Sequence, residues 1–481
     1  MLAIIWTALA VMSLLSTAHA NGFTLDLTSE SSIKSAAKIV AQGLMNYYHG
    51  DESGYTPGIF SGDYYWWESG AAWGSLMDYQ YLTGDTQYND VMKTGLLFQV
   101  GTDWDYTPKN QTLSLGNDDQ GFWGITAMMA AERNFTNPDS DQPQWLGLAQ
   151  AVFNSIALTW DTQYCDGGVR WQKFVLNKGY DYKNSIANGI LFQLGARLAR
   201  YTNNDTYAEW AEKVWDWETN IGLIPSATYF VYDGGSVDDN CARLNKIQWT
   251  YNMAVFLAGS AYMYNYTASS NLTSSGGTAS TWEQRTTSLV STLTAFIYQS
   301  SNIVYEPACE PSKSCNPDQQ SFKAYLARWL GATMILAPFT TDIILPVLKA
   351  SALAAASTCN GGTDGVTCGF SWTTEGTYDG MYGLGEQMAA LEIIQSHLLQ
   401  YNPAPYTNTT GGSSTGDSSL GTDELSGTSS KSITSKDRAG AWIITIAACV
   451  FVVLGAVWMG VEDKFEGTKN LKEWIRLEDL S

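Results

Sequence analysis

The stretch MDYQYLTGDTQYNDVM spans residues 77–92, and ARLARYTNNDTYAEWAEKV spans residues 196–214. In both, an apolar helical pattern ends in an aromatic residue and Thr, a Gly/Asn turn with Asp follows, and Tyr opens a second helical pattern. The Asp can cap the second helix by accepting hydrogen bonds from its first N–H groups. A looser copy, NFTNPDSDQPQWLGLAQAV, spans residues 134–152. The sequence therefore predicts a helix pair that repeats about every 50 to 75 residues.

Helical periodicity continues through most of the chain between residues 21 and 401, and strand-like alternation is confined to short pieces such as GVRWQKFV (168–175). We expect an all-α domain. Its predicted helices lie near residues 31–48, 68–83, 86–101, 118–133, 143–159, 183–201, 205–220, 246–265, 280–298, 320–337, 341–357 and 381–400.

Twelve helices in six pairs that close on themselves would form an (α/α)6 barrel, because each pair must bury its apolar face on its neighbours. First helices such as GFWGITAMMA (121–130) and YNMAVFLAGSAYMY (251–264) are apolar all round and are predicted to form the inner ring. Second helices such as TYAEWAEKVWDWE (206–218) are amphipathic and are predicted to lie outside. The loops that lead into the inner helices should then meet at one end of the barrel.

Both ends of the chain carry segments that differ from this body. Residues 1–20 are apolar and end in Ala18-His19-Ala20, which predicts a signal peptide followed by a catalytic domain over residues 21–401. Residues 402–438 are rich in Gly, Ser and Thr and are expected to form a flexible stalk. Residues 439–461 carry no charge and are long enough to span a membrane.

Two interpretations of the apolar segment 439–461 stay open. It could be the removable part of a GPI-anchor signal, or a retained transmembrane helix. A charged tail, residues 462–481, follows it, whereas a GPI signal should end in its apolar run. We therefore expect a single retained span that attaches the protein to the membrane, with the catalytic domain on the lumenal or extracellular side.

Cysteine usage and glycosylation sequons agree with the secretory pathway. Cys309 with Cys315 and Cys359 with Cys368 are close pairs in loops, as local disulfides would be. Cys165 with Cys241 is left by elimination, although six cysteines allow 15 connectivities. Asn-x-Ser/Thr sequons, which we expect to lie near turns and to be glycosylated, begin at Asn110, Asn134, Asn204, Asn265, Asn271 and Asn408.

Composition narrows the class of ligand. The formal net charge is −21, so nucleic acid would be repelled and is not an expected partner. Aromatic residues make up 13% of the chain and charged residues only 15%, which suits neutral, hydroxyl-rich ligands. His is nearly absent and no CxxC pair occurs, so we expect neither a metal nor a cofactor. We expect a monomer.

The loops before the predicted inner helices carry aromatic, amide and charged residues next to Gly or Ala. Aromatic rings that face the apolar faces of sugars, with polar groups on the hydroxyls, would form a carbohydrate cleft. The predicted substrate-binding residues are Trp66, Trp67, Glu68, Asn117, Gln120, Trp123, Tyr182, Asn184, Trp249, Asn252, Lys323, Arg328 and Trp372. These residues alone would equally suit a lectin that binds a glycan without cleaving it.

Asp118 and Asp119 are adjacent at the predicted start of an inner helix, in GNDDQGFWG (116–124). Two carboxylates can cleave a glycosidic bond, one as nucleophile and the other as general acid and base. Mutual repulsion raises one of the two pKa values, which keeps one group protonated. The alternative is that both only cap the helix. Asp238 and Asp239 are also adjacent but precede no Gly-aromatic helix, and they are interpreted as a loop.

With these residues in place, the sequence resembles the family 76 glycoside hydrolases, and most of all their fungal cell-wall branch of mannan endo-1,6-α-mannosidases. The resemblance is carried by YYWWESGAAWGSLMDY (64–79), NDDQGFWG (117–124), YKNSIANG (182–189) and WTYNMAVFLAG (249–259), and it covers about residues 23–400.

The resemblance implies an (α/α)6 barrel and retaining chemistry on α-1,6-linked mannose, with Asp118 as nucleophile and Asp119 as general acid and base. It also implies a transglycosidase that moves GPI-anchored proteins from the mannose core of their anchor to wall β-glucan. A simple endo-hydrolase of α-1,6-mannan and a non-catalytic mannan-binding wall protein stay open as alternatives. The family's usual GPI anchor does not fit the charged tail.

Overall fold

The computed structural model describes residues 17–19, 23–270, 277–299, 301–422, 442 and 445–454. The chain divides into two units, Met1–Asp423 and Glu424–Ser481, which are described separately. Within the first unit, each of the twelve predicted helical stretches overlaps one α-helix. These are α2 (Glu30–Met45), α3 (Trp66–Thr83), α4 (Asn89–Phe98), α5 (Asn117–Glu132), α6 (Trp145–Ala157), α7 (Ser185–Thr202), α8 (Asp205–Asn220), α9 (Thr250–Ser270), α10 (Ala279–Ser291), α11 (Pro317–Leu336), α12 (Thr341–Thr358) and α13 (Leu384–Gln395).

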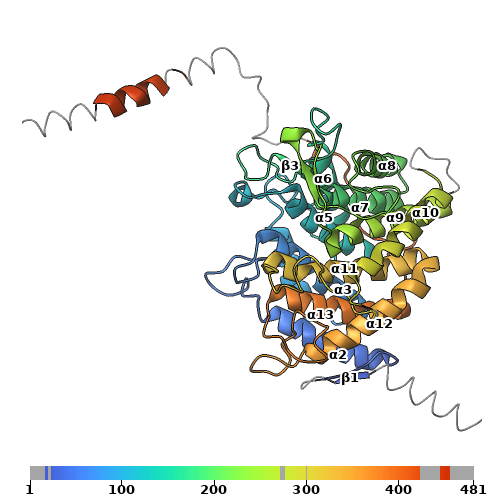
Figure 1. The fold of residues 1–481 in the computed structure, drawn as a ribbon. Coiled ribbons are helices and arrows are strands. Elements are labelled where there is room, and N and C mark those ends of the chain that lie inside the picture. The colour runs from blue at the N-terminus through green and yellow to red at the C-terminus, as the bar shows by residue number, and fades with distance from the viewer. Residues whose placement is uncertain are drawn as a thin grey trace, which may run out of the picture. The chain divides into compact units, whose positions relative to one another are not determined.

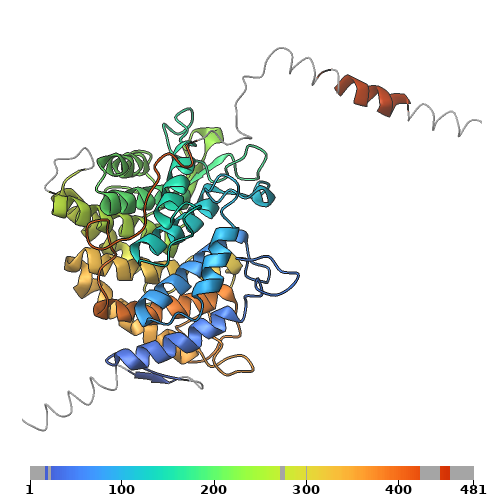
Figure 2. The ribbon, with the colours of Figure 1, turned by 180° about the vertical axis from the view of Figure 1, so that it is seen from behind.

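The helices of the first unit form two layers. In the inner layer, α3, α5, α7, α9, α11 and α13 each pack on the next, and α13 packs back on α3. The outer helices α4, α6, α8, α10 and α12 each pack on the inner helix before them in the chain. The remaining outer helix, α2, packs on α13, so the sixth pair joins the two ends of the body (Figures 1 and 2).

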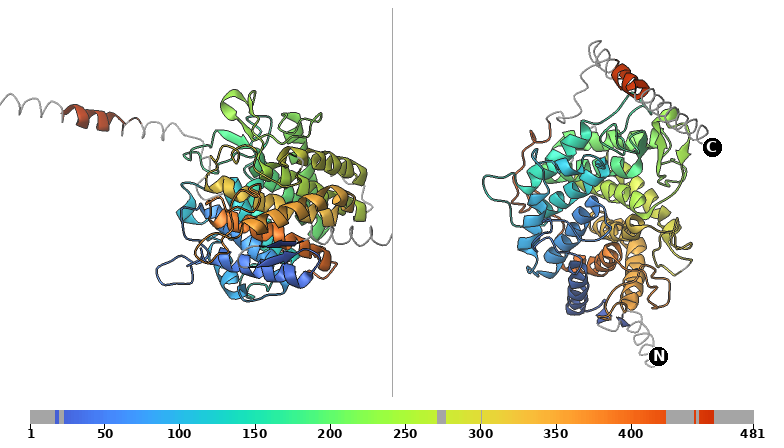
Figure 3. Two further views of the ribbon diagram at one scale, coloured as in Figure 1. Left: turned by 60° about the horizontal axis from the view of Figure 1, so that its bottom comes forward. Right: turned by 90° about the vertical axis from the view of Figure 1, so that its left-hand side faces the viewer.

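Burial follows the predicted patterns. Every residue of α5 except Asp119 is buried, as expected for an inner helix that is surrounded on all sides. On the outer helix α8 the buried residues form one stripe that includes Tyr207, Ala211, Val214 and Glu218. The two layers can be followed in the side views of Figure 3.

The repeated turn owes its composition to backbone geometry. Gly84 and Asn203 end α3 and α7 with φ values of 76° and 54°, in the left-handed region that Gly and Asn tolerate best. The predicted Asp cap is wrong for α8, because Asn204 accepts the hydrogen bond from the Thr206 N–H. Asp205 instead accepts a hydrogen bond from the Tyr266 hydroxyl of α9.

Short strands and 3-10 turns complete the body. β1 (Thr17–His19) pairs with β2 (Thr24–Asp26), and β3 (Tyr182–Asn184), β4 (Gly234–Ser236) and β5 (Leu244–Asn245) form a small antiparallel sheet that the sequence did not reveal. The strand-like piece 168–175 contributes only an isolated bridge between Gln172 and Gly116. Asp238 and Asp239 lie in a 3-10 turn, as the loop interpretation predicted. The 3-10 turns are η1 (Lys109–Gln111), η2 (Val237–Asp239), η3 (Thr292–Phe296), η4 (Pro338–Thr340) and η5 (Ser396–Tyr401).

The structure describes only residues 402–422 of the predicted stalk, and this part is not the free segment that its composition indicated. Residues 402–422 lie on the body, where the Tyr406 N–H donates to Glu132 O and the Asn408 N–H donates to Tyr201 O. Asn154 Nδ2 donates to the carbonyl oxygens of Ser418 and Leu420. A Gly/Ser/Thr segment buries little apolar surface, but its backbone can pair with polar groups of the helices, which sequence composition does not reveal.

The predicted terminal segments lie mostly outside the described residues. Of the signal peptide only Thr17–His19 is described, and of the segment 439–461 only residue 442 and the apolar helix Thr445–Leu454, which holds the free, exposed Cys449. In the described part of the chain one longer apolar stretch, Pro338–Thr358, could cross a membrane by length and composition. It contains η4 and the outer helix α12, and 44% of its apolar 18-residue window is buried in the body.

The three disulfides pair as predicted: Cys165–Cys241, Cys309–Cys315 and Cys359–Cys368. Of the sequons, Asn110, Asn134, Asn204 and Asn408 are exposed, and Asn271 lies outside the described residues. The predicted turn position is wrong for Asn265, which lies inside α9. Its Oδ1 accepts a hydrogen bond from Arg200 Nε.

Candidate active site

A cleft of about 250 Å³ lies where the N-terminal ends of the inner helices meet. Every inner helix except α13 contributes to it, directly or through the residues just before the helix. This is the end of the barrel at which the sequence predicted the loops to converge. The lining residues are Trp67, Asp118, Asp119, Phe122, Trp171, Tyr182, Asn184, Asp233, Trp249, Tyr251, Asp318, Gln319 and Phe322.

Asp118 and Asp119 are the second and third residues of α5, and both line the cleft. Asp118 is 8% exposed, and its Oδ1 accepts a hydrogen bond of 3.0 Å from the Asp119 N–H. Asp119 Oδ2 accepts the Gly116 N–H at 2.7 Å. A Cβ on Gly116 would overlap Asp118 Oδ1 and lie 3.2 Å from Asp119 Oδ2, so both carboxylates reach back over this glycine. The pair does cap the helix, and it also faces the cleft.

The two carboxylates share an environment that favours protonation. Burial, and then the charge of Asp119, raise the pKa of Asp118 well above its ordinary value. Burial raises the pKa of Asp119 to about 7, and the charge of Asp318 adds to the increase. Because both values are raised, the pair holds fewer than two negative charges near neutral pH. One protonated and one ionised carboxyl is the state that acid-assisted glycosidic cleavage requires.

β3 and the loop before β4 supply a second wall. Asn184 Nδ2 donates to Asp118 Oδ2 at 3.4 Å. The Tyr182 hydroxyl donates to Asp233 Oδ2 at 2.8 Å, and Asn245 Nδ2 donates to the same oxygen at 3.0 Å. Tyr182 and Asn184 point to the same face because they are two residues apart on a strand.

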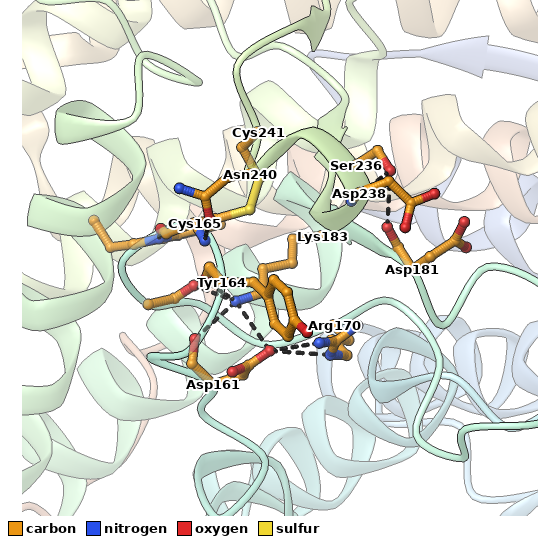
Figure 4. Close-up of a disulfide and its surroundings, with 12 residues drawn as sticks. Asp161, Tyr164, Cys165, Arg170, Asp181, Lys183, Ser236, Asp238, Asn240 and Cys241 are labelled. Carbon is orange, nitrogen blue, oxygen red and sulfur yellow. Dashed lines mark hydrogen bonds and ion pairs between the residues drawn. A yellow bond between two sulfur atoms is a disulfide. The ribbon is translucent and has the colours of Figure 1, made fainter.

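Lys183, between them, points the other way and anchors this strand (Figure 4). Its Nζ is buried and donates to the carbonyl oxygens of Asp161, Tyr164 and Gly167 at 2.6–2.8 Å. The Cys165–Cys241 disulfide links the same loop to the turn after β4. The cleft wall is therefore held by a buried cation and a covalent bond.

Aromatic rings line the remaining sides. Tyr251 and Phe322 stack at 3.7 Å with an interplanar angle of 7°, and Trp249 packs edge-on against Phe322. Trp67 packs on Phe122 and donates its indole N–H to Asp318 Oδ1 at 3.2 Å. These contacts fix the rings in place, which lowers the entropy cost of binding a ligand between them.

A second lobe of about 330 Å³ adjoins the first and shares Trp67, Asp119, Trp171 and Asp318 with it. Trp66 lines this lobe, stacks on Trp123, and donates its indole N–H to Gln99 Oε1 at 2.9 Å. Trp123 stacks in turn on the buried Tyr106. The other residues of the second lobe are Tyr65, Gln111, Leu113, Ser114, Leu115, Gln172, Asn177 and Lys178.

Five of the thirteen predicted substrate-binding residues therefore line one or both lobes: Trp66, Trp67, Tyr182, Asn184 and Trp249. The prediction that the residue lines the cleft is wrong for the other eight. Four of these lie just behind the cleft. Glu68 Oε2 accepts the Tyr65 N–H and caps α3. Asn117 and Gln120 accept hydrogen bonds from the buried Lys173. Trp123 stacks on the buried side of Trp66.

The other four lie deeper in the body. Lys323 pairs with Glu310 at 3.1 Å and faces the rings of Phe370 and the buried Trp372. Arg328 pairs with Glu392 at 2.6 Å in a buried cluster away from the cleft. Asn252 is fully buried in α9. Asn252 and Lys323 each directly follow a residue that lines the cleft, Tyr251 and Phe322, but are themselves fully buried. Arg328 lies farther down α11, and Trp372 is buried under its loop.

Seven lining residues of the first lobe were not predicted: Phe122, Trp171, Asp233, Tyr251, Asp318, Gln319 and Phe322. Asp318 had a detectable signal, because it is the second residue of α11, the position that Asp118 holds in α5. Asp233 had no such sequence signal, since it lies in a loop. In the folded chain its carboxylate accepts a hydrogen bond from the Tyr182 hydroxyl. Within the described residues, no group of three or more His, Cys, Asp or Glu is placed to hold a metal ion.

A model of glycosyl hydrolase family 76 matches residues 32–409, which include every residue of this cleft. The chain belongs to glycosyl hydrolase family 76. Family 76 membership agrees with the helical barrel and with a carboxylate pair at its open end.

Several relatives are similar over nearly their whole length. The chain is 50% identical to the mannan endo-1,6-alpha-mannosidase DCW1 of Saccharomyces cerevisiae, covering 93% of this chain and 97% of that one. It is 46% identical to the mannan endo-1,6-alpha-mannosidase DFG5 of the same yeast, covering 90% of this chain and 93% of that one.

Solved structures share the fold. Dfg5 from Chaetomium thermophilum, in complex with glucosamine, is 45% identical with a TM-score of 0.78, covering 83% of this chain and 97% of that one. The α-1,6-mannanase GH76A of Salegentibacter sp. HEL1_6 is 17% identical with a TM-score of 0.60, covering 76% of this chain and 99% of that one. The second likeness concerns the fold alone.

Proposed function

We propose that this protein cleaves α-1,6-mannosidic bonds with retention of configuration and transfers the released mannosyl end to a sugar acceptor. The donor is the mannose core of a GPI-anchored protein, and the acceptor is cell-wall β-glucan. One observation carries the proposal: Asp118 lines only the first lobe of the cleft, whereas Asp119 lines both.

The roles follow from this placement. Asp118 is the more enclosed carboxylate, and burial raises its pKa. The hydrogen bonds that it accepts from Asn184 and from the Asp119 N–H oppose this increase, because they stabilise its ionised form. The N-terminus of α5 favours the same charge by about 0.3–1 kcal/mol. Asp118 therefore attacks the anomeric carbon, and Asp119, with a pKa raised to about 7 by burial, protonates the departing oxygen.

The charge of the first lobe bears on the donor. Four aspartates line it, Asp118, Asp119, Asp233 and Asp318, and its lining includes no Lys or Arg. Phosphorylated or carboxylated sugars would be repelled there, while neutral mannose is tolerated and a protonated amino sugar is favoured. The Chaetomium relative binds glucosamine, and the yeast relatives are named for action on 1,6-linked mannan. Both agree with a donor in which mannose leads to an amino sugar.

One incubation tests the proposal. The purified ectodomain would be mixed with an α-1,6-linked mannose oligosaccharide and a β-glucan oligosaccharide, and the products would be analysed by mass spectrometry. We expect a joined product. Free mannoside alone would make the protein a hydrolase, and an intact donor would make it a lectin.

The place of action is part of the proposal. The apolar N-terminus, the sequons and the apolar segment 439–461 support a membrane-attached protein whose catalytic domain faces the cell wall. Asn110, Asn134, Asn204 and Asn408 are exposed, which agrees with glycosylation at these sequons.

A further inference from the structure

The segment 402–422 carries the chain from one end of the barrel to the other. It begins beside the C-terminal end of α3, where the Tyr81 hydroxyl donates to Pro403 O at 3.1 Å. It ends beside the last turn of α6, where Asn154 Nδ2 donates to Leu420 O at 2.8 Å. Inner helices start at the cleft end, so α3 ends at the opposite end, whereas the outer helix α6 runs back and ends at the cleft end. The chain therefore leaves the described body beside the cleft.

Two glycines allow the segment to lie this close to α6. A Cβ on Gly416 would overlap Gln150 Oε1, and a Cβ on Gly421 would overlap Ala151 O. Gly421 also has a φ of 71°, in the left-handed region that other residues rarely adopt. The path along α6 therefore follows from the residues of the segment, and it fixes the point from which residues 423–438 continue.

A turn of unusual composition lies beside this exit. The Asn177 N–H donates to Phe174 O at 3.0 Å, so Val175 and Leu176 are the two central residues of a β-turn. Gly, Pro, Asn, Asp and Ser dominate such positions. Here both residues are aliphatic, and Val175 is 70% and Leu176 92% exposed. We call residues 174–177 the apolar turn.

Hydrogen bonds on both sides hold the apolar turn at the cleft end. Just before it, Lys173 Nζ donates to Ser155 O, in the last turn of α6, at 3.2 Å. Within it, Asn177 Nδ2 donates to Thr112 O of the neighbouring loop at 3.1 Å. Because the segment 402–422 ends at the same turn of α6, the exit of the chain and the apolar turn lie close together at this end of the body.

We propose that Val175 and Leu176 insert into the surface of a lipid bilayer and that the open end of the cleft thereby faces the membrane. The inference rests on the membrane attachment proposed above. Aliphatic side chains offer neither a ring face nor a hydrogen bond to a sugar, whereas the boundary between lipid head groups and acyl chains accepts them. Lys178 is exposed next to the turn, and its long side chain can keep the ammonium group among the head groups. Leu113 of the neighbouring loop is exposed too, but it follows the Asn110 sequon, so we assign insertion to the apolar turn alone.

The length of chain beyond the body agrees with this occupant. Residues 423–438 separate the body from the apolar segment 439–461 and can reach at most ~55 Å. A chain released at residue 402 would have more than twice that reach and would leave from the opposite end. The shorter reach from the cleft end keeps the apolar turn at a high effective concentration over the lipid. The body then lies on the cell-wall side of the membrane, with its cleft turned toward a donor that is anchored in the lipid.

A depth measurement tests this contact without catalysis. The full-length protein with Cys449→Ser would be reconstituted, ectodomain outward, into phosphatidylcholine vesicles, and Leu176→Cys would carry an environment-sensitive fluorophore. We expect nitroxide-labelled lipids to quench this probe at least threefold more strongly than the same probe on Ile343→Cys. Ile343 is the matched control, because it is an exposed aliphatic residue at the start of α12, at the end of the barrel opposite the cleft.

A comparison of two donors measures the consequence for activity. Val175→Glu combined with Leu176→Glu would place charge where an apolar contact is needed, so cleavage of a GPI glycolipid in the same vesicles should fall at least fivefold. Cleavage of a water-soluble α-1,6-mannotetraose should change less than twofold, because neither residue lines either lobe of the cleft. Ile343→Glu should alter neither rate. An equal loss on both donors would show that the turn acts on the cleft rather than on the membrane, and would overturn the proposal.

Failure of the proposed function is separable from failure of this inference. A wild-type protein that cleaves neither donor would refute the proposed function alone, because quenching at Leu176 is measured without a donor. Quenching equal to that at Ile343 would overturn the membrane contact. Energy transfer between Leu176 probes on different copies, without quenching by lipid, would assign the apolar turn to a contact between two molecules and would overturn it as well.

Discussion

Asn184 donates its side-chain amide to Asp118 Oδ2 at 3.4 Å, while its own Oδ1 accepts the Ala187 N–H as the N-cap of α7. The cap occupies the oxygen, so the nitrogen is the end that faces the carboxylate. A helix start thereby orients a hydrogen-bond donor toward the proposed nucleophile.

The first prediction is that Asn184→Asp reduces kcat at least 100-fold without unfolding the protein. Asp caps a helix as well as Asn does, but it would bring a second acceptor and a negative charge to Asp118. The pKa of Asp118 should rise further, which moves the acidic limb of the kcat profile to higher pH. Asn204→Asp, the same change at the N-cap of α8, is the control and should leave the profile unchanged. An unmoved acidic limb would contradict the role given to Asn184.

The second prediction concerns the carboxylate pair. Asp118→Asn and Asp119→Asn should each lower kcat by several orders of magnitude with an unchanged circular dichroism spectrum, because each removes one of the two groups that the chemistry needs. Asp238→Asn, in the other adjacent pair, serves as the control.

A rescue experiment then distinguishes the two roles. Azide should restore turnover to Asp118→Gly with an inverted glycosyl azide, since azide takes the place of the missing nucleophile. Inverted product from Asp119→Gly instead would reverse the assignment.

The third prediction is a pH dependence of cleavage. Asp119, whose pKa burial raises to about 7, must be protonated to act as the acid, so kcat/KM should fall as the pH rises through 7. This alkaline limb is separate from the acidic limb, on which Asp118 becomes protonated. Asp318→Asn removes a negative charge that helps to raise this pKa. The alkaline limb should then move to lower pH, and the rate at pH 7 should fall about threefold. Asp342→Asn, at the exposed start of α12, should not move the limb.

The fourth prediction is that the folded state is more stable in mild acid than at pH 8. Burial raises the pKa of Glu218 to about 8 from 4.5, and it does the same for Glu68 and Glu306. Between these two values the folded protein keeps protons that the unfolded chain has lost, so stability falls as the pH rises. Tm should drop by several degrees from pH 5 to pH 8, and Glu218→Gln should flatten the slope. Replacement of the exposed Glu283 by Gln should leave the slope of Tm against pH unchanged. A wild-type Tm that does not depend on pH in this range would contradict the prediction.

The fifth prediction concerns attachment. A tag fused after Ser481 should stay with the ectodomain through carbonate extraction, because a charged tail follows the apolar segment 439–461. Release of the protein by phospholipase C, together with loss of the tag, would show a GPI anchor instead. The orientation of the catalytic domain would be unaffected.

The helices were predictable because their signals are local. Apolar residues recur with helical spacing, and Gly84 and Asn203 mark the ends of two inner helices with residues that tolerate positive φ. The pairing of α2 with α13 was not predictable, since no local pattern links two helices at opposite ends of a domain.

The site divides in the same way. Asp118 and Asp119 could be found because they are adjacent in sequence at a helix start. Arg328 was misplaced because residue type does not report depth: it lies eleven residues beyond Pro317, ~16 Å down α11. Asp233 was missed because only the folded chain brings its loop to Tyr182.

The pairing of α2 with α13 also orders the assembly of the protein during its synthesis. The buried face of α2, which includes Ile33, Val40 and Leu44, is made among the first residues, yet the helix that covers it begins only at Leu384. During synthesis this apolar face stays uncovered while some 340 further residues are made. Until α13 has formed, the face can pack against the wrong partner. The ring of helices therefore closes only after α13 has been synthesised. A chain truncated before α13 would leave the apolar face of α2 uncovered.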